Sequence, residues 1–143
     1  MGYHSMTDDE RSAFLRDPIR PAILSTVRAD GRPHAAPVWY DFDEDVVVFM
    51  TGASTVKGRN LTRDPRLTLC VQDERPPFSF VVLEGRAALS DEPDELRKWA
   101  AQIGGRYMGA DRAEEFGARN GVPGELLVRV TVERSISAAD LSA

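Results

Sequence analysis

The chain is dominated by short stretches of β-branched and aromatic residues separated by turn-forming residues. Asp30-Gly31 and the acidic run 43–45 each lie between two such stretches, and Asp-Gly favours tight hairpin turns because both residues tolerate positive φ. Strands joined by turns this short pair antiparallel. We expect about six strands, at residues 22–27, 33–42 (with a break near Pro37), 46–51, 66–73, 80–89 (with a bulge at Glu84-Gly85) and 126–132.

Helical patterns precede the first strand and the last strand of this series. Thr7 and Glu10 have capping-box spacing, and Pro93 suits a first helical position with Ser90 or Asp91 as its cap. Shorter helices are expected before Asp64 and across 111–119. The late helix presents one apolar face, formed by Leu96, Trp99, Ala100, Ile103 and Tyr107. Because a twisted six-stranded antiparallel sheet tends to close on itself, the pattern predicts a mainly β fold, a small barrel with accessory α-helices.

Length and composition restrict the classes of protein that remain. A chain of 143 residues forms one ordinary domain. Its net charge of −5 argues against binding to duplex nucleic acid, which needs a basic face. Cys70 is the only cysteine, so an intrachain disulfide and a cysteine-based zinc site are excluded, and this usage fits the cytoplasm. No metal site is expected.

The N-terminus and the apolar runs also bear on location. The longest apolar run, residues 46–50, is far shorter than a membrane span, and the first residues lack the regions of a signal peptide. A second methionine, Met6, precedes acidic polar sequence. We therefore interpret residues 1–6 as a tag remnant or alternative start and residues 7–143 as a single domain.

A basic segment follows the third expected strand. Lys57, Arg59, Arg63 and Arg66 place four positive charges in ten residues, against the single acid Asp64. Two hydroxyl groups precede the lysine, at a strand end that leads into a helix start, where backbone N–H groups are free. This donor set suits a phosphate group, although the spacing is not that of a Walker A loop. A solvated basic helix remains the alternative interpretation.

An ordered series of segments resembles the pyridoxamine 5′-phosphate oxidase-like split-barrel superfamily, and within it the actinobacterial branch that uses the deazaflavin coenzyme F420. The segments are Gly31-Arg32-Pro33, Pro37-Val38-Trp39-Tyr40, residues 48–51, residues 57–61 and Asp64-Pro65-Arg66, continued by residues 81–89 and 126–132. The resemblance spans residues 12–135. It implies a six-stranded antiparallel split β-barrel of the FMN-binding type, and a homodimer with cofactor sites at the subunit interface.

The resemblance also implies which residues bind the cofactor. The phosphate would be held by the segment 54–59, and the ring would lie along strand backbone. The implied cofactor-binding residues are Pro37, Val38, Trp39, Met50, Thr51, Ser54, Thr55, Lys57, Arg59 and, as a weaker candidate, Gln72. A strand near residues 37–40 carries an arginine and a lysine in the flavin oxidases but neither here, and the C-terminal Arg-x-His element is absent. Oxidation of pyridoxamine phosphate is therefore not expected.

The favoured hypothesis is an F420-dependent oxidoreductase that transfers a hydride between the deazaflavin and a small organic acceptor, with its catalytic residues unassigned. In such an enzyme the cofactor supplies the reactive atom and the protein supplies position and polarity. Three alternatives stay open: an FMN-binding flavin reductase or oxidase, a non-catalytic flavin or tetrapyrrole binding protein, and a barrel whose basic segment has no specific role.

Five further residues carry separate expectations. Trp39 either stacks near the cofactor or fills the barrel. Tyr107 and Met108 are weaker candidates for the substrate pocket. Cys70 is expected to be a small buried residue and His34 to lie at the surface.

Overall fold

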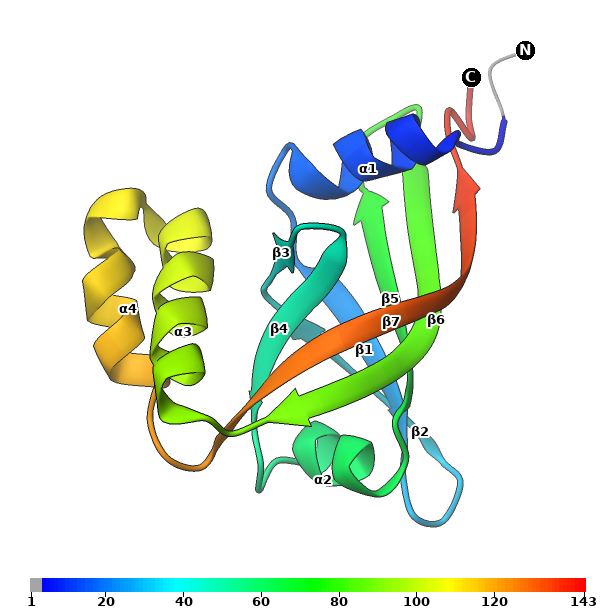
Figure 1. Ribbon diagram of the computed structural model, residues 1–143. Helices are drawn as coiled ribbons and strands as arrows, with labels where there is room; N and C mark the ends of the chain where they lie inside the picture. Colours follow the sequence, from blue (N-terminus) through cyan, green and yellow to red (C-terminus); the bar gives the residue numbers. More distant parts are fainter. Residues whose placement is uncertain (1–3) are drawn as a thin grey trace.

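The computed structural model describes residues 4–143, which form a curled antiparallel sheet with helices at its ends and on one side (Figure 1). The elements in chain order are α1 (Asp8–Arg16), β1 (Ala22–Val27), β2 (Pro33–Val38), β3 (Tyr40–Asp43), β4 (Val46–Gly52), α2 (Val56–Arg63), β5 (Arg66–Asp73), β6 (Ser79–Ser90), α3 (Pro93–Met108), the 3₁₀ helix η1 (Ala110–Arg112), α4 (Ala113–Asn120) and β7 (Glu125–Ala138). The expected fold class, an antiparallel split barrel with accessory helices, is confirmed.

The strand order is β2-β1-β5-β6-β7-β4-β3, and every pair is antiparallel. The two edge strands, β2 and β3, are consecutive in the chain and are separated by Trp39 alone. Since the chain passes from one edge of the sheet directly to the other, the barrel is split at Trp39. The break expected near Pro37 within 33–42 falls at Trp39 and separates two strands at opposite edges of the sheet. The sheet of the described residues therefore has seven strands rather than the expected six.

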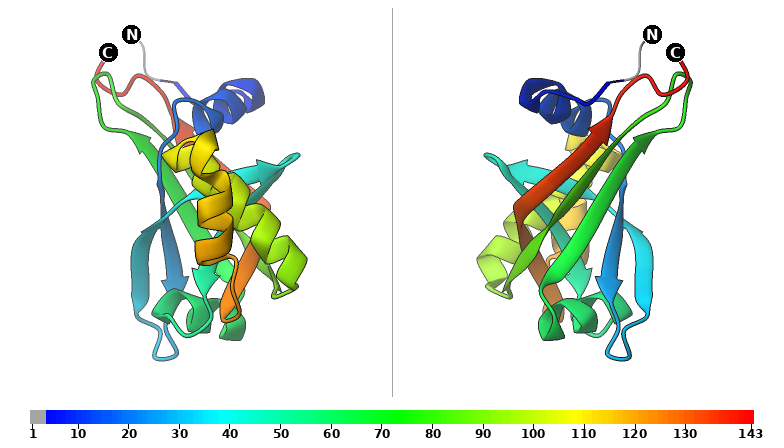
Figure 2. Two further views of the ribbon diagram at one scale, coloured as in Figure 1. Left: turned by 90° about the vertical axis from the view of Figure 1, so that its left-hand side faces the viewer. Right: turned by 90° about the vertical axis from the view of Figure 1, so that its right-hand side faces the viewer.

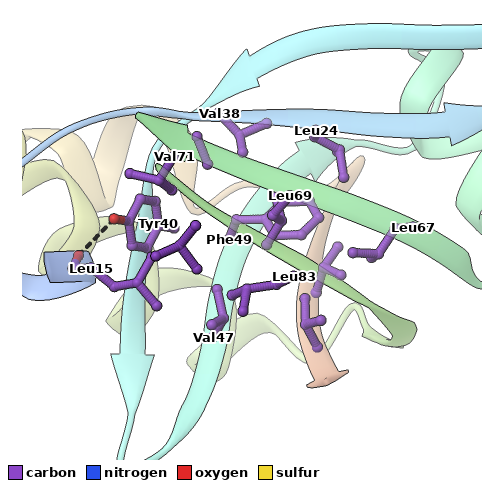
Figure 3. Close-up of a cluster of buried hydrophobic side chains, with 14 of the residues drawn as sticks. Leu15, Leu24, Val38, Tyr40, Val47, Phe49, Leu67, Leu69, Val71 and Leu83 are labelled. Atoms are coloured by element: carbon purple, nitrogen blue, oxygen red, sulfur yellow. Dashed lines mark hydrogen bonds between the residues drawn. The ribbon is translucent and has the colours of Figure 1, made fainter. Parts of the chain in front are cut away.

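The inner face of the curled sheet forms the main core (Figure 3). Leu67, Leu69 and Val71 alternate inward along β5, as their period of two predicts. Each fully buried side chain of this size contributes about 1.5–3 kcal/mol. Tyr40 belongs to the same core, and its hydroxyl donates a 2.6 Å hydrogen bond to the carbonyl of Leu15 at the end of α1. Helix α1 thereby closes one end of the barrel.

A second apolar cluster attaches the α3–α4 hairpin to the outside of β4 and β7. It consists of Val48, Leu96, Trp99 and Leu127, so the apolar face predicted for the late helix is confirmed. The cap of α3 is Glu92, whose carboxylate accepts from the backbone N–H of Asp94 and of Glu95. The expected cap at Ser90 or Asp91 is wrong, because β6 continues to Ser90 and the helix begins directly at Pro93.

Local features of the strands agree with the sequence in part. The register shift in the β6–β7 pair falls between Glu84 and Gly85, as predicted. A Cβ on Gly85 would lie 2.2 Å from the carbonyl oxygen of Thr131, so the bulge requires glycine there. Strand β7 continues to Ala138, six residues beyond the expected end, because its polar second half still pairs with β6.

The first described residues lie against the sheet. The backbone of His4 forms a two-way bridge with Ala139, and the backbone N–H of Met6 donates to the Ser137 hydroxyl. Residues 1–3, part of the segment interpreted as a tag remnant or alternative start, lie outside the described residues. None of the helices within 4–143 is long and apolar enough to span a membrane.

Candidate active site

The end of β4 and the start of α2 form a tight strand–turn–helix unit. Thr55 caps α2: its hydroxyl accepts from the N–H of Gly58 and donates to the carbonyl of Gly52. A Cβ on Gly58 would lie 2.0 Å from that same Gly52 oxygen. Glycine at position 58 therefore allows α2 to pack directly on the strand end. The first turn of α2, like that of any helix, has N–H groups without intrahelical acceptors.

A pocket of about 410 Å³ lies between this unit and the α3–α4 hairpin. One wall is the strand region beside the split of the barrel, and the opposite wall is the apolar side of α3. The lining residues are Pro21, Pro37, Val38, Trp39, Met50, Thr51, Gly52, Lys57, Ala100, Ile103, Gly104, Asn120 and Glu125. The pocket thus combines apolar side chains with polar ones, which include one ammonium group, that of Lys57, and one carboxyl group, that of Glu125.

The pocket unites six of the ten residues that the sequence resemblance implied. They are Pro37, Val38, Trp39, Met50, Thr51 and Lys57. They come from three separate segments, and the fold brings them together because β4 lies beside the split where β2 ends.

Four implied residues lie elsewhere. Ser54 is exposed and does not line the pocket, and the Thr55 hydroxyl is engaged in the helix cap. Arg59 lines a different hollow on the other side of α2, since residues two apart on a helix do not face the same way. Gln72 lies on the outer side of β5, in a hollow that it shares with Cys70. The cofactor roles of all ten residues remain predictions.

Trp39 forms an aromatic wall of the pocket. Its ring stacks on that of Tyr107 with centroids 4.9 Å apart and an interplanar angle of 3°, and it meets Phe116 edge-on at 6.0 Å. The Tyr107 hydroxyl accepts from the N–H of Tyr40 and donates to the carbonyl of Arg20. Trp39 is 37% exposed, so its ring is held in place by α3 and α4 while part of it remains accessible.

Sequence reasoning missed Glu125, Asn120 and the α3 residues of the pocket. Glu125 pairs with Gly52 in the β4–β7 register, and its carboxylate is the one acid among the lining residues. Burial raises the pKa of this carboxyl, and the Lys57 ammonium opposes that shift. No local sequence signal marks Glu125, because its place depends on which residue of β4 it faces.

Two other expectations about single residues need correction. Cys70 is half-buried on the outer side of β5 rather than packed in the core, and burial raises the pKa of its thiol. His34 is also half-buried rather than at the surface, and its Nδ1 is buried with no hydrogen-bond partner among the described residues. Residues 4–143 bring together no three His, Cys, Asp or Glu side chains in a metal-binding arrangement.

Residues 7–137 match the family described as pyridoxamine 5′-phosphate oxidase. The chain belongs to this family. A Mycobacterium tuberculosis relative named F420H2-dependent biliverdin reductase is 30% identical over 135 residues, 93% of this chain and 89% of the relative. The resemblance to the pyridoxamine 5′-phosphate oxidase-like superfamily and to its F420 branch is thereby confirmed.

Solved structures of the family share the fold. A conserved hypothetical protein from Mycobacterium tuberculosis superimposes with a TM-score of 0.83 at 26% identity, covering 96% of this chain and 89% of that one. A structure named F420 reductase gives a TM-score of 0.68 at 22% identity, covering 87% and 94%.

The donor set of the pocket fits the phosphate of a cofactor. Lys57 stands in the first turn of α2, where its ammonium, the free N–H groups and the positive end of the helix dipole favour an anion together. Glycine at position 52 leaves room for its neighbours, because a Cβ there would lie 3.2 Å from both the Glu125 carboxylate and the Thr55 methyl group. The planar Trp39 ring and the apolar strand residues suit an aromatic ring system.

Proposed function

We propose that this protein is a cytoplasmic F420-dependent oxidoreductase that transfers a hydride between the deazaflavin and a small conjugated acceptor. The observation that carries the proposal is the pocket, which combines the Lys57 ammonium with the aromatic ring of Trp39, held by its stack on Tyr107. The 30% identity to an F420H2-dependent biliverdin reductase supports the choice of cofactor. A linear tetrapyrrole is the first acceptor to test, because that relative is named for biliverdin.

The residues of the pocket divide the work of binding. When bound, F420 supplies the hydride chemistry. The Lys57 ammonium and the first turn of α2 hold the phosphate, and the backbone around Val38 and Met50 seats the ring. Trp39 offers a planar surface for the cofactor or the acceptor. The apolar wall from α3 excludes water, which strengthens the attraction between Lys57 and the phosphate.

The Glu125 carboxyl is the acidic group among the residues that line the pocket. Burial raises the pKa of this carboxyl above its usual value, and the Lys57 ammonium opposes that shift; its oxygens can accept hydrogen bonds from the N–H or O–H groups of a bound ligand. Catalysis would then depend chiefly on position and polarity, as expected when the cofactor carries the reactive atom.

We also propose that the protein is a homodimer. An apolar row crosses the outer side of the sheet through residues that are opposite one another in the register: Pro37, Ile23, Cys70, Val82 and Ile136. Ile23 is 43% exposed and Ile136 is 38% exposed. Because the row begins at Pro37, which lines the pocket, a second copy on this face would border the site. Ile136→Glu should yield monomers in light scattering, whereas Val46→Glu, equally exposed but outside the row, should not.

Titration of the purified protein with F420 and with FMN, followed by fluorescence, tests the cofactor assignment. We expect F420 to bind at least about tenfold more tightly, and reduced F420 to be oxidised when a conjugated acceptor is added. A preference for FMN would indicate a flavin enzyme instead. Tight binding without turnover of any acceptor would indicate a binding protein.

A further inference from the structure

A second hollow, of about 340 Å³, lies on the other side of α2 from the pocket. It is formed by α2 and by the turn between β1 and β2, which lie side by side at the end of the barrel away from both termini (Figure 2). Its lining residues are Arg28, Ala29, Asp30, Arg32, Val56, Arg59, Asn60 and Arg63. Four arginines from two segments of an acidic chain therefore converge on one concavity.

Carboxylates compensate the charge in this arginine hollow only in part. Asp30 is its one acid, and that carboxylate is engaged by the guanidinium of Arg32 at 2.9 Å and by the Arg32 backbone N–H. No ion pair within residues 4–143 includes Arg28, Arg59 or Arg63, and Arg28 and Arg63 attract the Asp30 and Asp64 carboxyls only at longer range. The lining thus has a net charge of +3, four arginines less one aspartate. Like charges gathered in this way repel one another until an anion relieves the repulsion.

The floor of the hollow is already ordered. Arg63 donates to the carbonyl of Val27, and its guanidinium lies 3.5 Å from the Oδ1 of Asn60. Asn60 is only 4% exposed, and its amide donates a 3.0 Å hydrogen bond to the hydroxyl of Thr26. The register partner of Thr26 is His34, whose Nδ1 is buried without a partner in the described chain. A guanidinium fixed in advance loses little freedom when it binds an anion.

We propose that the arginine hollow binds a diphosphate group, as a site separate from the cofactor pocket. A single phosphate monoester carries a charge of about −1.5 to −2 at pH 7, so two linked phosphate groups match the net charge of +3 better than one. Guanidinium groups pair with phosphate oxygens through two parallel hydrogen bonds. The concave shape favours a small anion over a nucleic acid strand. Free diphosphate and the diphosphate of a nucleotide share this chemistry.

Isothermal titration of the full chain with inorganic diphosphate, ADP and orthophosphate at 0.15 M salt tests the proposal. We expect diphosphate to bind more tightly than orthophosphate, and Arg59→Gln and Arg28→Gln each to weaken it about tenfold or more. Both arginines lie at the surface of the hollow, and an unchanged melting temperature verifies that the variants are folded. Equal affinity for ADP and diphosphate identifies the group alone as the ligand, and tighter binding of ADP identifies a nucleotide.

Two control variants separate this site from general attraction. Lys57→Gln removes the cation of the cofactor pocket, and Arg66→Gln removes a cation of the same segment outside the hollow; both should leave diphosphate binding unchanged. The proposal is overturned if wild-type protein does not bind diphosphate, if Lys57→Gln abolishes binding while Arg59→Gln does not, or if Arg66→Gln weakens binding as much as Arg59→Gln.

Discussion

The two sides of α2 carry similar charges in different surroundings. On one side Lys57 is half-buried and faces a pocket with apolar walls, an aromatic ring and a single carboxyl. On the other side Arg59 is exposed and faces a hollow lined by three further arginines. A cation beside apolar walls suits a ligand with one anionic end and an extended ring system, whereas a cluster of guanidiniums suits a compact polyanion. One basic run in the sequence thus supplies two chemically distinct concavities.

The largest effect is expected from Gly58→Ala, which should disturb both sides together. The added Cβ would lie 2.0 Å from the Gly52 oxygen, so α2 must shift away from β4. We expect a loss of about 1–3 kcal/mol in the free energy of unfolding, measured by urea denaturation, with weaker binding of both F420 and diphosphate. Arg59→Ala in the same helix is the control and should cost less than about 0.5 kcal/mol. Wild-type stability in Gly58→Ala would contradict the close packing of α2.

A smaller effect, confined to the pocket side, is expected from Trp39→Ala. The loss of the ring stack on Tyr107 should cost about 0.5–1.5 kcal/mol beyond the lost apolar area, and turnover of a conjugated acceptor should fall. Trp39→Phe should restore most of the stability in urea denaturation. Diphosphate titration should not change in either variant. A change there would show that the two sides of α2 are coupled.

The smallest effect concerns Asp64, which ends α2 and belongs to neither concavity. Hydrogen bonds from the side chain and the backbone N–H of Arg66 lower the pKa of Asp64 from 3.8 to about 2. Since the folded pKa is the lower one, the stabilisation is present above about pH 4 and is lost as the pH falls toward 2. The melting temperature of Asp64→Asn should therefore lie slightly below that of wild type at pH 6, and the gap should narrow below pH 4. A gap that stays constant down to pH 2 would argue against this pair.

Features that depend on local periodicity were predictable from the sequence. The inward face of β5, the bulge at Glu84-Gly85 and the apolar side of α3 all follow from alternation, turn chemistry or helical spacing. The division of the basic segment was also predictable in principle, because a helix over 56–63 turns Lys57 and Arg59 away from each other.

Features that depend on sheet register were not predictable. Trp39 separates two strands because the chain crosses from one sheet edge to the other, which requires the complete strand order. Glu125 enters the pocket because it faces Gly52 across the β4–β7 pair. Gln72 lies outside the pocket because β5 is separated from β2 by β1 and from β4 by β6 and β7 in the strand order. In each case the deciding contact joins segments far apart in the chain.

The most direct test is a pair of F420 titrations on Lys57→Gln and Arg59→Gln, followed by fluorescence under one set of conditions. If the pocket beside Lys57 holds the cofactor phosphate, Lys57→Gln should lose about 1.5–3 kcal/mol of binding free energy, the value of a charge-assisted hydrogen bond. Arg59→Gln should stay within about twofold of wild type, since its side chain lies on the other side of α2. Unchanged F420 affinity in Lys57→Gln, or equal losses of affinity in both variants, would contradict the assignment of the cofactor phosphate to the pocket beside Lys57.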